Sequence, residues 1–205
     1  MPKQEAPLEA IKKFIPAPAA QPVLDYLQHY KVHLTVTRDR KSVLGDYRHA
    51  TLYKAHRISV NGSLNPYNFL ITLIHELAHL VTFIRFGNRV SPHGAEWKTT
   101  YAELLKGFLT REIFPDEILK ALSLSLHDLP ASSCSDDNLM RVLKKYDHGE
   151  NGLVMVEQLP EGRLFDIGKG KIFKKGKKLR KRFQCVEVET GKVYLFSPLY
   201  EVKIV

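Results

Sequence analysis

The first hydrophobic pattern along the chain is one of short alternating segments. Residues 33–37, HLTVT, alternate polar and apolar side chains and are rich in β-branched residues, which predicts a strand. Residues 42–53 and 57–60 have the same character and are predicted as two further strands, the second of them ended by the turn pair Asn61-Gly62. A short helix is predicted over residues 24–30. The prolines and alanines of residues 1–22 predict a flexible, at most partly helical lead-in.

Helical spacing begins after these strands. Asn65 is a favourable N-cap and Pro66 suits the first helical position, so a helix is predicted from residue 66 to about residue 86. Gly87 or Asn88 can adopt the left-handed conformation that ends it. A second helix is predicted from near Gly94, and two further amphipathic helices over residues 115–127 and 136–147, with a loop at 132–135 between them. The apolar face of the second helix comprises Trp97, Tyr101, Leu104, Leu105 and Phe108.

The last quarter of the chain has a different pattern of residues. Beyond residue 149 glycines recur between short β-type runs at 164–167, 182–188 and 193–196, which predicts a small antiparallel β domain of meander or barrel type. The expected fold class is therefore α+β. The expected domains are the lead-in, a mixed domain over residues 23–148 and a basic β domain over residues 149–205.

Composition excludes several classes of protein. Hydrophobic residues make up 44% and charged residues 26%, as in ordinary soluble globular proteins. The N-terminal residues lack the apolar segment of a secretory signal, and the longest apolar run, residues 69–84, contains three polar residues and is expected to fall short of a membrane span. The two cysteines, Cys134 and Cys185, form no metal-binding pattern. We expect a cytoplasmic protein without membrane association.

The three polar residues in that apolar run are the strongest chemical signal. His75, Glu76 and His79 form an HExxH motif, in which the two histidines lie one turn apart on one helix face and can hold two corners of a zinc site. Glu76 lies beside them as the candidate general base of a zinc hydrolase. The composition gives this pattern about a 2% chance of arising by accident. The alternative is a hydrogen-bonded pair of core histidines.

A catalytic zinc site usually has three protein ligands and one open position. His93, fourteen residues after His79, is the favoured third ligand, because residues 87–92 supply a turn that could bring it back. Glu96 is the competing candidate, and the favoured role for its carboxylate is to interact with the positive end of the second helix. The remaining histidines lack such spacing and are expected in surface or core roles: His29, His33, His49, His56, His127 and His148.

The sequence also resembles a known family. HELAHL, followed by HGAEWK and preceded by HRISVNGSLNPYNFLITLI, resembles the SprT-like (Spartan-related) zinc metalloproteases over roughly residues 25–125. The resemblance implies a compact zincin-type core made of a small sheet, the HExxH helix and the helices that follow. It implies one zinc ion held by His75, His79 and His93, with Glu76 as the catalytic acid and base. Eukaryotic members of the family degrade proteins crosslinked to DNA.

The chain departs from the family pattern at its C-terminal end. Many SprT-like proteins end in a four-cysteine zinc ribbon, whereas this tail retains only Cys185, so a second, structural zinc ion is not expected. Residues 151–205 carry 12 basic and 6 acidic residues, and nine of the basic residues fall within residues 169–183. Such a run predicts salt-dependent, sequence-independent DNA binding, with a solvated surface as the alternative. The candidate contact residues are Lys174, Lys175, Lys177, Lys178, Arg180, Lys181 and Arg182.

The function expected from these patterns is zinc-dependent hydrolysis of peptide bonds in a protein substrate, with DNA-associated or DNA-crosslinked proteins as one substrate class. Two alternatives remain open: a nucleic-acid-binding protein with a structural or idle zinc site, and a zinc hydrolase of a non-peptide bond. Tyr67 and Tyr101 are candidate transition-state donors, although packing roles are favoured for both. Residues 45–48 could pair with an extended substrate, although an ordinary edge strand is favoured.

Overall fold

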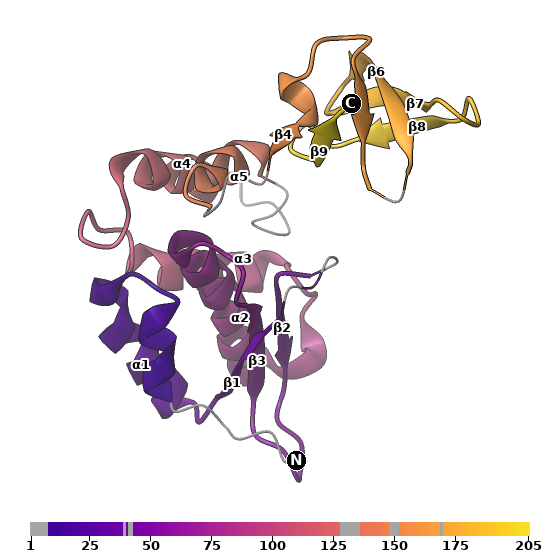
Figure 1. Cartoon of the computed structure of the whole chain (residues 1–205). Helices are drawn as coiled ribbons and strands as arrows, with labels where there is room; N and C mark the ends of the chain where they lie inside the picture. The colour runs from indigo at the N-terminus through magenta and orange to yellow at the C-terminus, as the bar shows by residue number, and fades with distance from the viewer. Residues whose placement is uncertain (1–7, 39, 41–42, 128–135, 148–151, 169) are drawn as a thin grey trace, which may run out of the picture. The chain divides into compact units, whose positions relative to one another are not determined.

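The computed structural model describes residues 8–38, 40, 43–127, 136–147, 152–168 and 170–205. The chain divides into two compact units, Met1–Asp147 and His148–Val205 (Figure 1). The fold is mixed α+β, and the second unit is an antiparallel sheet, as the sequence predicts at this level. Each unit has its own hydrophobic core, so the two are described in turn.

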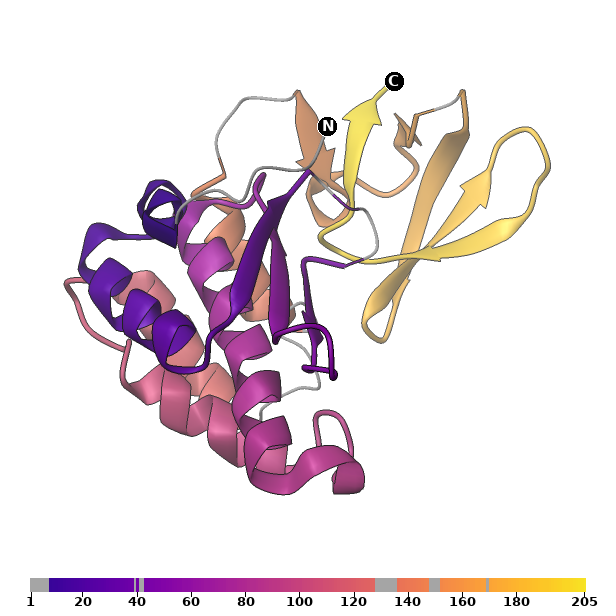
Figure 2. The same cartoon turned by 90° about the horizontal axis from the view of Figure 1, so that it is seen from below.

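A three-stranded sheet forms one side of the first unit (Figures 1 and 2). The strands are β1 (His33–Thr37), β2 (Gly45–Arg48) and β3 (Arg57–Asn61), in the order β1-β3-β2, with β1 parallel and β2 antiparallel to β3. Ile58 and Val60 of β3 are fully buried. The strand predicted over residues 42–53 is much shorter. Residues 51–54 form a turn instead, in which Leu52 and Tyr53 are more than 90% exposed.

Helix α2 (Pro66–Phe86) is the central element of the first unit and contacts β2, β3 and α3. Its predicted bounds are confirmed. The side chain of Asn65 accepts a hydrogen bond from the Asn68 amide at 3.0 Å, and Gly87 follows the helix with φ of 65°. By length and composition α2 could cross a membrane, contrary to expectation, but 72% of its most apolar window is buried. That burial is typical of the core helix of a soluble domain.

The N-terminal segment is part of the core from Ile11 onwards. It forms the 3-10 helices η1 (Leu8–Lys13) and η2 (Ala17–Ala19), followed by helix α1 (Ala20–His29). Ile11 and Ile15 are buried at 2% and 5% exposure. The expectation of a flexible lead-in up to residue 22 therefore does not describe residues 11–22, because apolar side chains between the prolines pack against the core.

Three more helices complete the first unit: α3 (Ala95–Lys106), α4 (Asp116–His127) and α5 (Asp137–Lys144), with the 3-10 helix η3 (Gly87–Arg89) after α2. The predicted apolar face of α3, with Phe108 beyond its end, is buried as expected. Helices α4 and α5 pack against each other. The loop predicted at residues 132–135, which includes Cys134, lies outside the described residues.

The second unit is a six-stranded antiparallel sheet around a small core. Its strand order is β4-β9-β5-β6-β7-β8, and a 3-10 helix, η5 (Val156–Gln158), follows β4. Strands β4, β6 and β9 were not predicted from the sequence. Strands β4 and β9 are short, and the charged residues of β6 hide its alternation of apolar and polar positions. The strands are β4 (Leu153–Met155), β5 (Leu164–Asp166), β6 (Ile172–Leu179), β7 (Arg182–Glu187), β8 (Val193–Phe196) and β9 (Glu201–Ile204).

Candidate metal centre

Three histidine rings of the first unit meet at their Nε2 atoms. The distance from Nε2 of His79 to Nε2 of His75 is 3.2 Å, and to Nε2 of His93 it is 3.0 Å. The third side of this triangle, between His75 and His93, is 3.2 Å. Among the histidine, cysteine and carboxylate side chains that the structure describes, these three histidines have ligand atoms close enough together to hold one metal ion.

Two of the rings meet because of helical geometry. His75 and His79 are four residues apart on α2, so they lie on the same face one turn apart. Apolar residues surround them on the helix, and His75 is only 8% exposed. Burial of two imidazoles in such a helix costs free energy unless they share a partner.

The third ring comes from a tight turn before α3. The Gly94 amide donates to the Ser91 carbonyl at 2.9 Å, and Pro92 and His93 occupy the middle of this turn. His93 has φ of 61°, the left-handed region that a type II turn requires at its third position and that glycine normally supplies. A histidine held in this less favourable conformation is an observation typical of functional sites.

Burial keeps these imidazoles neutral. Burial, with a smaller effect of His79 and His93, lowers the pKa of His75 to about 3, and burial, with a smaller effect of His93, lowers that of His79 to about 4. Burial also lowers the pKa of His93. The neutral form is the one whose ring nitrogen offers a lone pair to a metal ion.

The triangle fits a tetrahedral metal ion. Zn–N bonds of about 2.0–2.1 Å place tetrahedral ligand nitrogens about 3.3–3.4 Å apart, close to the observed 3.0–3.2 Å. Three mutually facing nitrogens cannot all be satisfied by hydrogen bonds to one another, because each neutral Nε2 is either a donor or an acceptor. A cation at the centre of the three would satisfy all of them. The donor set therefore supports a metal cofactor.

Trp97 packs against the rings of all three histidines, a contact that was not predicted from the sequence. Its ring centroid lies 4.6 Å from that of His75, 5.3 Å from His79 and 4.7 Å from His93. Tyr101 stacks on the other part of this aromatic layer, 5.0 Å from Trp97 with nearly parallel planes. One signal in the sequence could have predicted this contact: Trp97, in the first turn of α3, follows His93 by four residues. The contact was missed because Trp97 was assigned only to the apolar face of α3.

The two tyrosines proposed as donors occupy different places. Tyr101 is buried within the aromatic layer at 3% exposure. Tyr67 packs against Phe114 and Tyr146, with ring centroids 6.0 and 5.0 Å away. These contacts agree with the packing roles that were favoured for both residues.

Glu76 is a buried carboxyl group beside the triangle. It is 6% exposed, and burial raises its pKa to about 8, with Asp46 raising it and Arg40 lowering it by smaller amounts. Gly45 of strand β2 faces it closely: a Cβ atom at Gly45 would lie 2.6 Å from Oε1 of Glu76. A carboxyl group with a raised pKa in a site with candidate metal ligands is a typical proton acceptor and donor.

The other candidates lie apart from this centre. Glu96 is in the first turn of α3, as expected, and does not belong to the three-histidine group. Nδ1 of His56 contacts the hydroxyl of Tyr47 at 2.9 Å, and His49 stacks on Phe83. His29 packs edge-on against the ring of Tyr30. His33 begins strand β1. The side chains of His127 and His148 are outside the described residues.

The basic run of the second unit lies on the hairpin of β6 and β7. Six of the seven candidate residues are exposed: Lys174, Lys177, Lys178, Arg180, Lys181 and Arg182. Lys175 differs from expectation, because it is only 6% exposed. Its ammonium group donates to the carbonyl oxygens of Glu157 and Leu159 and lies 4.2 Å from the ring centroid of Phe183. Lys175 therefore serves the interior of the unit rather than a phosphate group.

Comparison with known proteins finds a family that part of the first unit matches. Residues 20–112 match the family model of the SprT-like family. Protein SprT from Yersinia pestis is 33% identical over 104 residues, which cover 45% of this chain and 61% of the Yersinia protein. No solved structure matches. The matched residues contain the whole three-histidine group and Glu76. The resemblance noted from the HELAHL and HGAEWK motifs is thereby confirmed, and residues 20–112 of this chain match the SprT-like family.

Proposed function

We propose that this protein is a zinc metalloendopeptidase with a zincin-type core that hydrolyses peptide bonds in a protein substrate. The observation that carries the proposal is the triangle of three neutral imidazole nitrogens, 3.0–3.2 Å apart, beside the buried carboxyl group of Glu76. A purely structural metal site would not need an acidic residue adjacent in sequence to two of its ligands. The protease activity implied by the SprT-like resemblance supports the same function.

The residues divide the chemistry between them. His75, His79 and His93 would hold one zinc ion, which leaves a fourth position open to water and substrate. The ion would supply Lewis acidity, lowering the pKa of a water molecule in that position to about 7 and polarising the scissile carbonyl group. Glu76 accepts the proton of the attacking water and delivers it to the leaving amine. Trp97 orients the imidazole rings by packing against all three of them.

We propose in addition that the second unit binds DNA through phosphate contacts and so directs proteolysis to DNA-associated or DNA-crosslinked proteins. Support comes from the exposed lysine and arginine side chains on the β6–β7 hairpin and from the net charge of +6 on residues 151–205. The basic run contains two phenylalanines that could stack on bases, but Phe173 is 2% exposed, and Phe183 packs against the core with the ammonium group of Lys175 over its ring. Binding would therefore be electrostatic and largely independent of sequence.

The proposal is tested by replacing the general base. Purified protein loaded with one zinc ion per chain should degrade a mixed protein substrate, and a chelator should abolish the activity. Glu76→Gln should retain zinc and fold but lose about 10²–10⁴-fold in turnover, because an amide cannot accept the proton. The matched control is Glu103→Gln, which alters an exposed carboxylate on α3 that is paired with Arg85. Its turnover should stay normal.

Each alternative predicts a different result. Zinc-loaded protein without any proteolysis would favour a nucleic-acid-binding protein with an idle metal site, or a hydrolase of a non-peptide bond. Normal proteolysis by the Glu76→Gln variant would contradict the assigned role of this residue. A parallel measurement with and without DNA shows whether nucleic acid stimulates the activity.

A further inference from the structure

The backbone of strand β2 lies directly against the carboxyl group of Glu76. A Cβ atom at Gly45 would be 2.6 Å from Oε1 of Glu76, 2.9 Å from its Cγ and 2.8 Å from Cγ2 of Thr72. Carbon atoms that are not bonded to one another do not approach so closely, since attraction between them is optimal at about 3.5–4.0 Å. Glycine is thus the only residue that leaves Glu76 in its observed place while β2 keeps its position.

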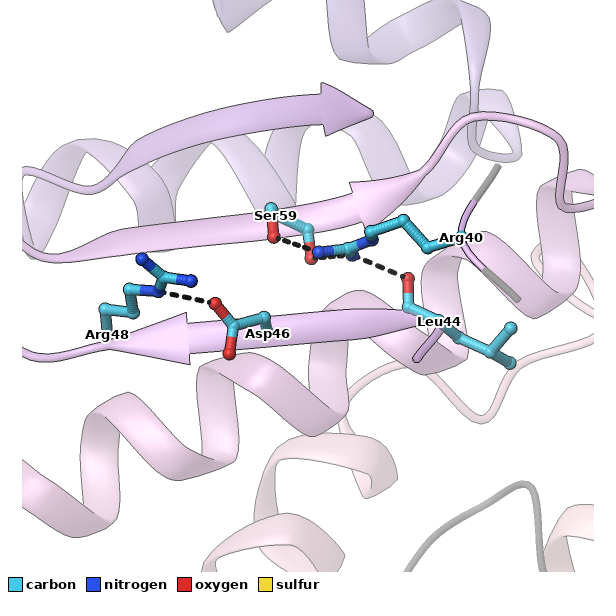
Figure 3. A network of polar contacts seen from close by, with 5 residues as sticks. All are labelled: Arg40, Leu44, Asp46, Arg48 and Ser59. Carbon is cyan, nitrogen blue, oxygen red and sulfur yellow. Dashed lines mark hydrogen bonds and ion pairs between the residues drawn. The ribbon is translucent and has the colours of Figure 1, made fainter. Parts of the chain in front are cut away.

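The segment before Gly45 is fastened to the sheet by a network of polar contacts, part of which Figure 3 shows. Arg40 donates to Oγ of Ser59 at 3.0 Å, to the Leu44 carbonyl at 3.4 Å and to Oδ1 of Asn61 at 2.8 Å. Asn61 is fully buried and donates its backbone amide to the Leu44 carbonyl at 2.9 Å. Its side-chain amide also donates to the Val43 carbonyl at 3.1 Å. These bonds tie the start of β2 to β3, and both strands pack against α2.

We propose that Gly45 is a positioning residue for Glu76, which it holds in the orientation needed for proton transfer. The inference rests on the proposed function. With β2 fastened by Arg40 and Asn61, a larger side chain at position 45 cannot be accommodated by an outward shift of the strand. The displacement falls instead on Glu76, whose terminal atoms are the most easily moved of the three contacts. The histidine triangle stays intact, because none of its rings lies among the atoms nearest to that Cβ position.

The test compares Gly45→Ala with Gly107→Ala, a control at the end of α3 where a Cβ atom would meet only the Leu104 carbonyl at 3.3 Å. Gly45→Ala should retain one zinc ion per chain and lose about 10–100-fold in kcat on a quenched-fluorescent casein substrate, with KM within twofold of normal. Misplacement of a reacting group by about 1 Å is sufficient for such a loss. Gly107→Ala should keep normal kcat and zinc content. Zinc loss by Gly45→Ala would overturn the proposal. A raised KM with normal kcat would also overturn it, because that result would indicate that β2 contacts the substrate instead.

A double variant separates the contact with Glu76 from general crowding. Thr72→Ser removes the methyl group that a Cβ at Gly45 would strike, so Gly45→Ala/Thr72→Ser leaves Glu76 as the conflicting neighbour. The double variant should fold and show the same loss of kcat. Thr72→Ser alone should show no such loss. Recovery of normal kcat in the double variant would show that Thr72, not Glu76, transmits the effect.

Crystal structures of the wild type and of the double variant give a result that does not depend on activity. The expected outcome is a changed Glu76 rotamer with unchanged positions of β2 and of the three histidine rings. An unmoved Glu76, with β2 displaced instead, would overturn the inference. The failure of the proposed function is distinguishable, because in that case the zinc-loaded wild type would show no proteolysis, or Glu76→Gln would leave it unaffected, while the rotamer change in the double variant remained.

Discussion

At the scale of single residues, Glu76 combines two opposing requirements. It is buried beside an apolar helix interior, yet proton transfer requires that it ionise. In the metal-free protein burial raises its pKa from 4.5 to about 8, so the folded protein keeps a proton that the unfolded chain releases between these values. The contribution of Glu76 to the free energy of unfolding therefore decreases as pH rises from about 4.5, and the decrease is complete above about pH 8.

This leads to a prediction for Glu76→Gln in the metal-free state. The variant lacks the titrating group, so it should be more stable than the wild type by an amount that grows between pH 4.5 and pH 8, on the order of 4 kcal/mol at the upper end. Urea unfolding of both proteins across this range measures the difference. The buried histidines titrate in both proteins and cancel in the comparison. A stability difference that does not depend on pH would contradict the raised pKa.

His93 allows metal binding to be separated from folding. Asparagine adopts positive φ readily, so His93→Asn should fit the turn and change the free energy of unfolding of the metal-free protein by less than about 0.5 kcal/mol. Zinc affinity should fall by more than about 100-fold, since one of three ligands is lost. Competition with a chromophoric chelator measures the affinity. His49→Asn, which alters a histidine outside the triangle, should bind zinc normally, and so should Glu96→Ala. Loss of zinc by Glu96→Ala and retention by His93→Asn would contradict the ligand assignment.

At the scale of secondary-structure elements, α2 shows why much of this fold could be predicted. Its N-cap, its first-turn proline and the glycine at its end are local signals, and all three act as the sequence indicated. The strands were harder. Residues 49–53 were predicted as part of a strand but belong to the connection between β2 and β3, where Leu52 and Tyr53 are exposed and pair with no sheet. Strand β6 was hidden because three of its four exposed positions and one buried position are lysines.

The same distinction applies to the site. The two ligands on α2 follow from helical spacing, and the third ligand follows from the position of one turn. Residues 45–48 were considered only as a segment that could pair with substrate, and the relation of Gly45 and Arg40 to Glu76 could not be recognised, because it depends on how β2 packs against α2. Glycine at the start of a strand carries no signal of what faces it. Contacts between elements distant in sequence are the part that patterns along the chain do not encode.

The N-cap of α2 has a larger role than a simple cap, which gives a prediction at this scale. Asn65 accepts from the Asn68 amide and also donates to the Leu143 carbonyl at 2.9 Å and to Asp147 at 2.7 Å. Asn65→Ala should remove the cap and the two hydrogen bonds that Asn65 donates to Leu143 and Asp147, at a cost of about 2–4 kcal/mol. Asp136→Ala, the control, removes an exposed cap of α5 and should cost only about 1 kcal/mol. Equal losses measured by denaturant unfolding would show that the link from Asn65 to α5 contributes little.

At the scale of the whole molecule, chemistry and charge are divided between two units. The metal centre belongs to residues 20–112, while residues 151–205 hold two thirds of the net positive charge. The second unit keeps its own core of aromatic residues and anchors its buried Lys175 on backbone carbonyl groups. Its exposed basic side chains lie outside that core, with Lys178 reaching to 5.7 Å from the ring centroid of Phe183, and their removal should affect DNA binding without unfolding the unit.

The last prediction concerns these exposed side chains in the full-length protein. Affinity for single-stranded DNA should fall linearly with salt on logarithmic axes, with a slope near −0.7 for each phosphate contacted. Replacing four exposed lysines of the β6–β7 hairpin by glutamine should make the slope shallower by about 3 and weaken all sequences alike, provided that each contacts one phosphate. The four are Lys174, Lys177, Lys178 and Lys181.

A control with the same loss of charge replaces four exposed lysines of the first unit: Lys13, Lys54, Lys106 and Lys120. Fluorescence anisotropy titrations over a range of salt concentrations compare the two. The hairpin variant alone should change the slope, because only close contacts release counterions. Equal effects of both variants would show that DNA is attracted by net charge rather than held by the second unit.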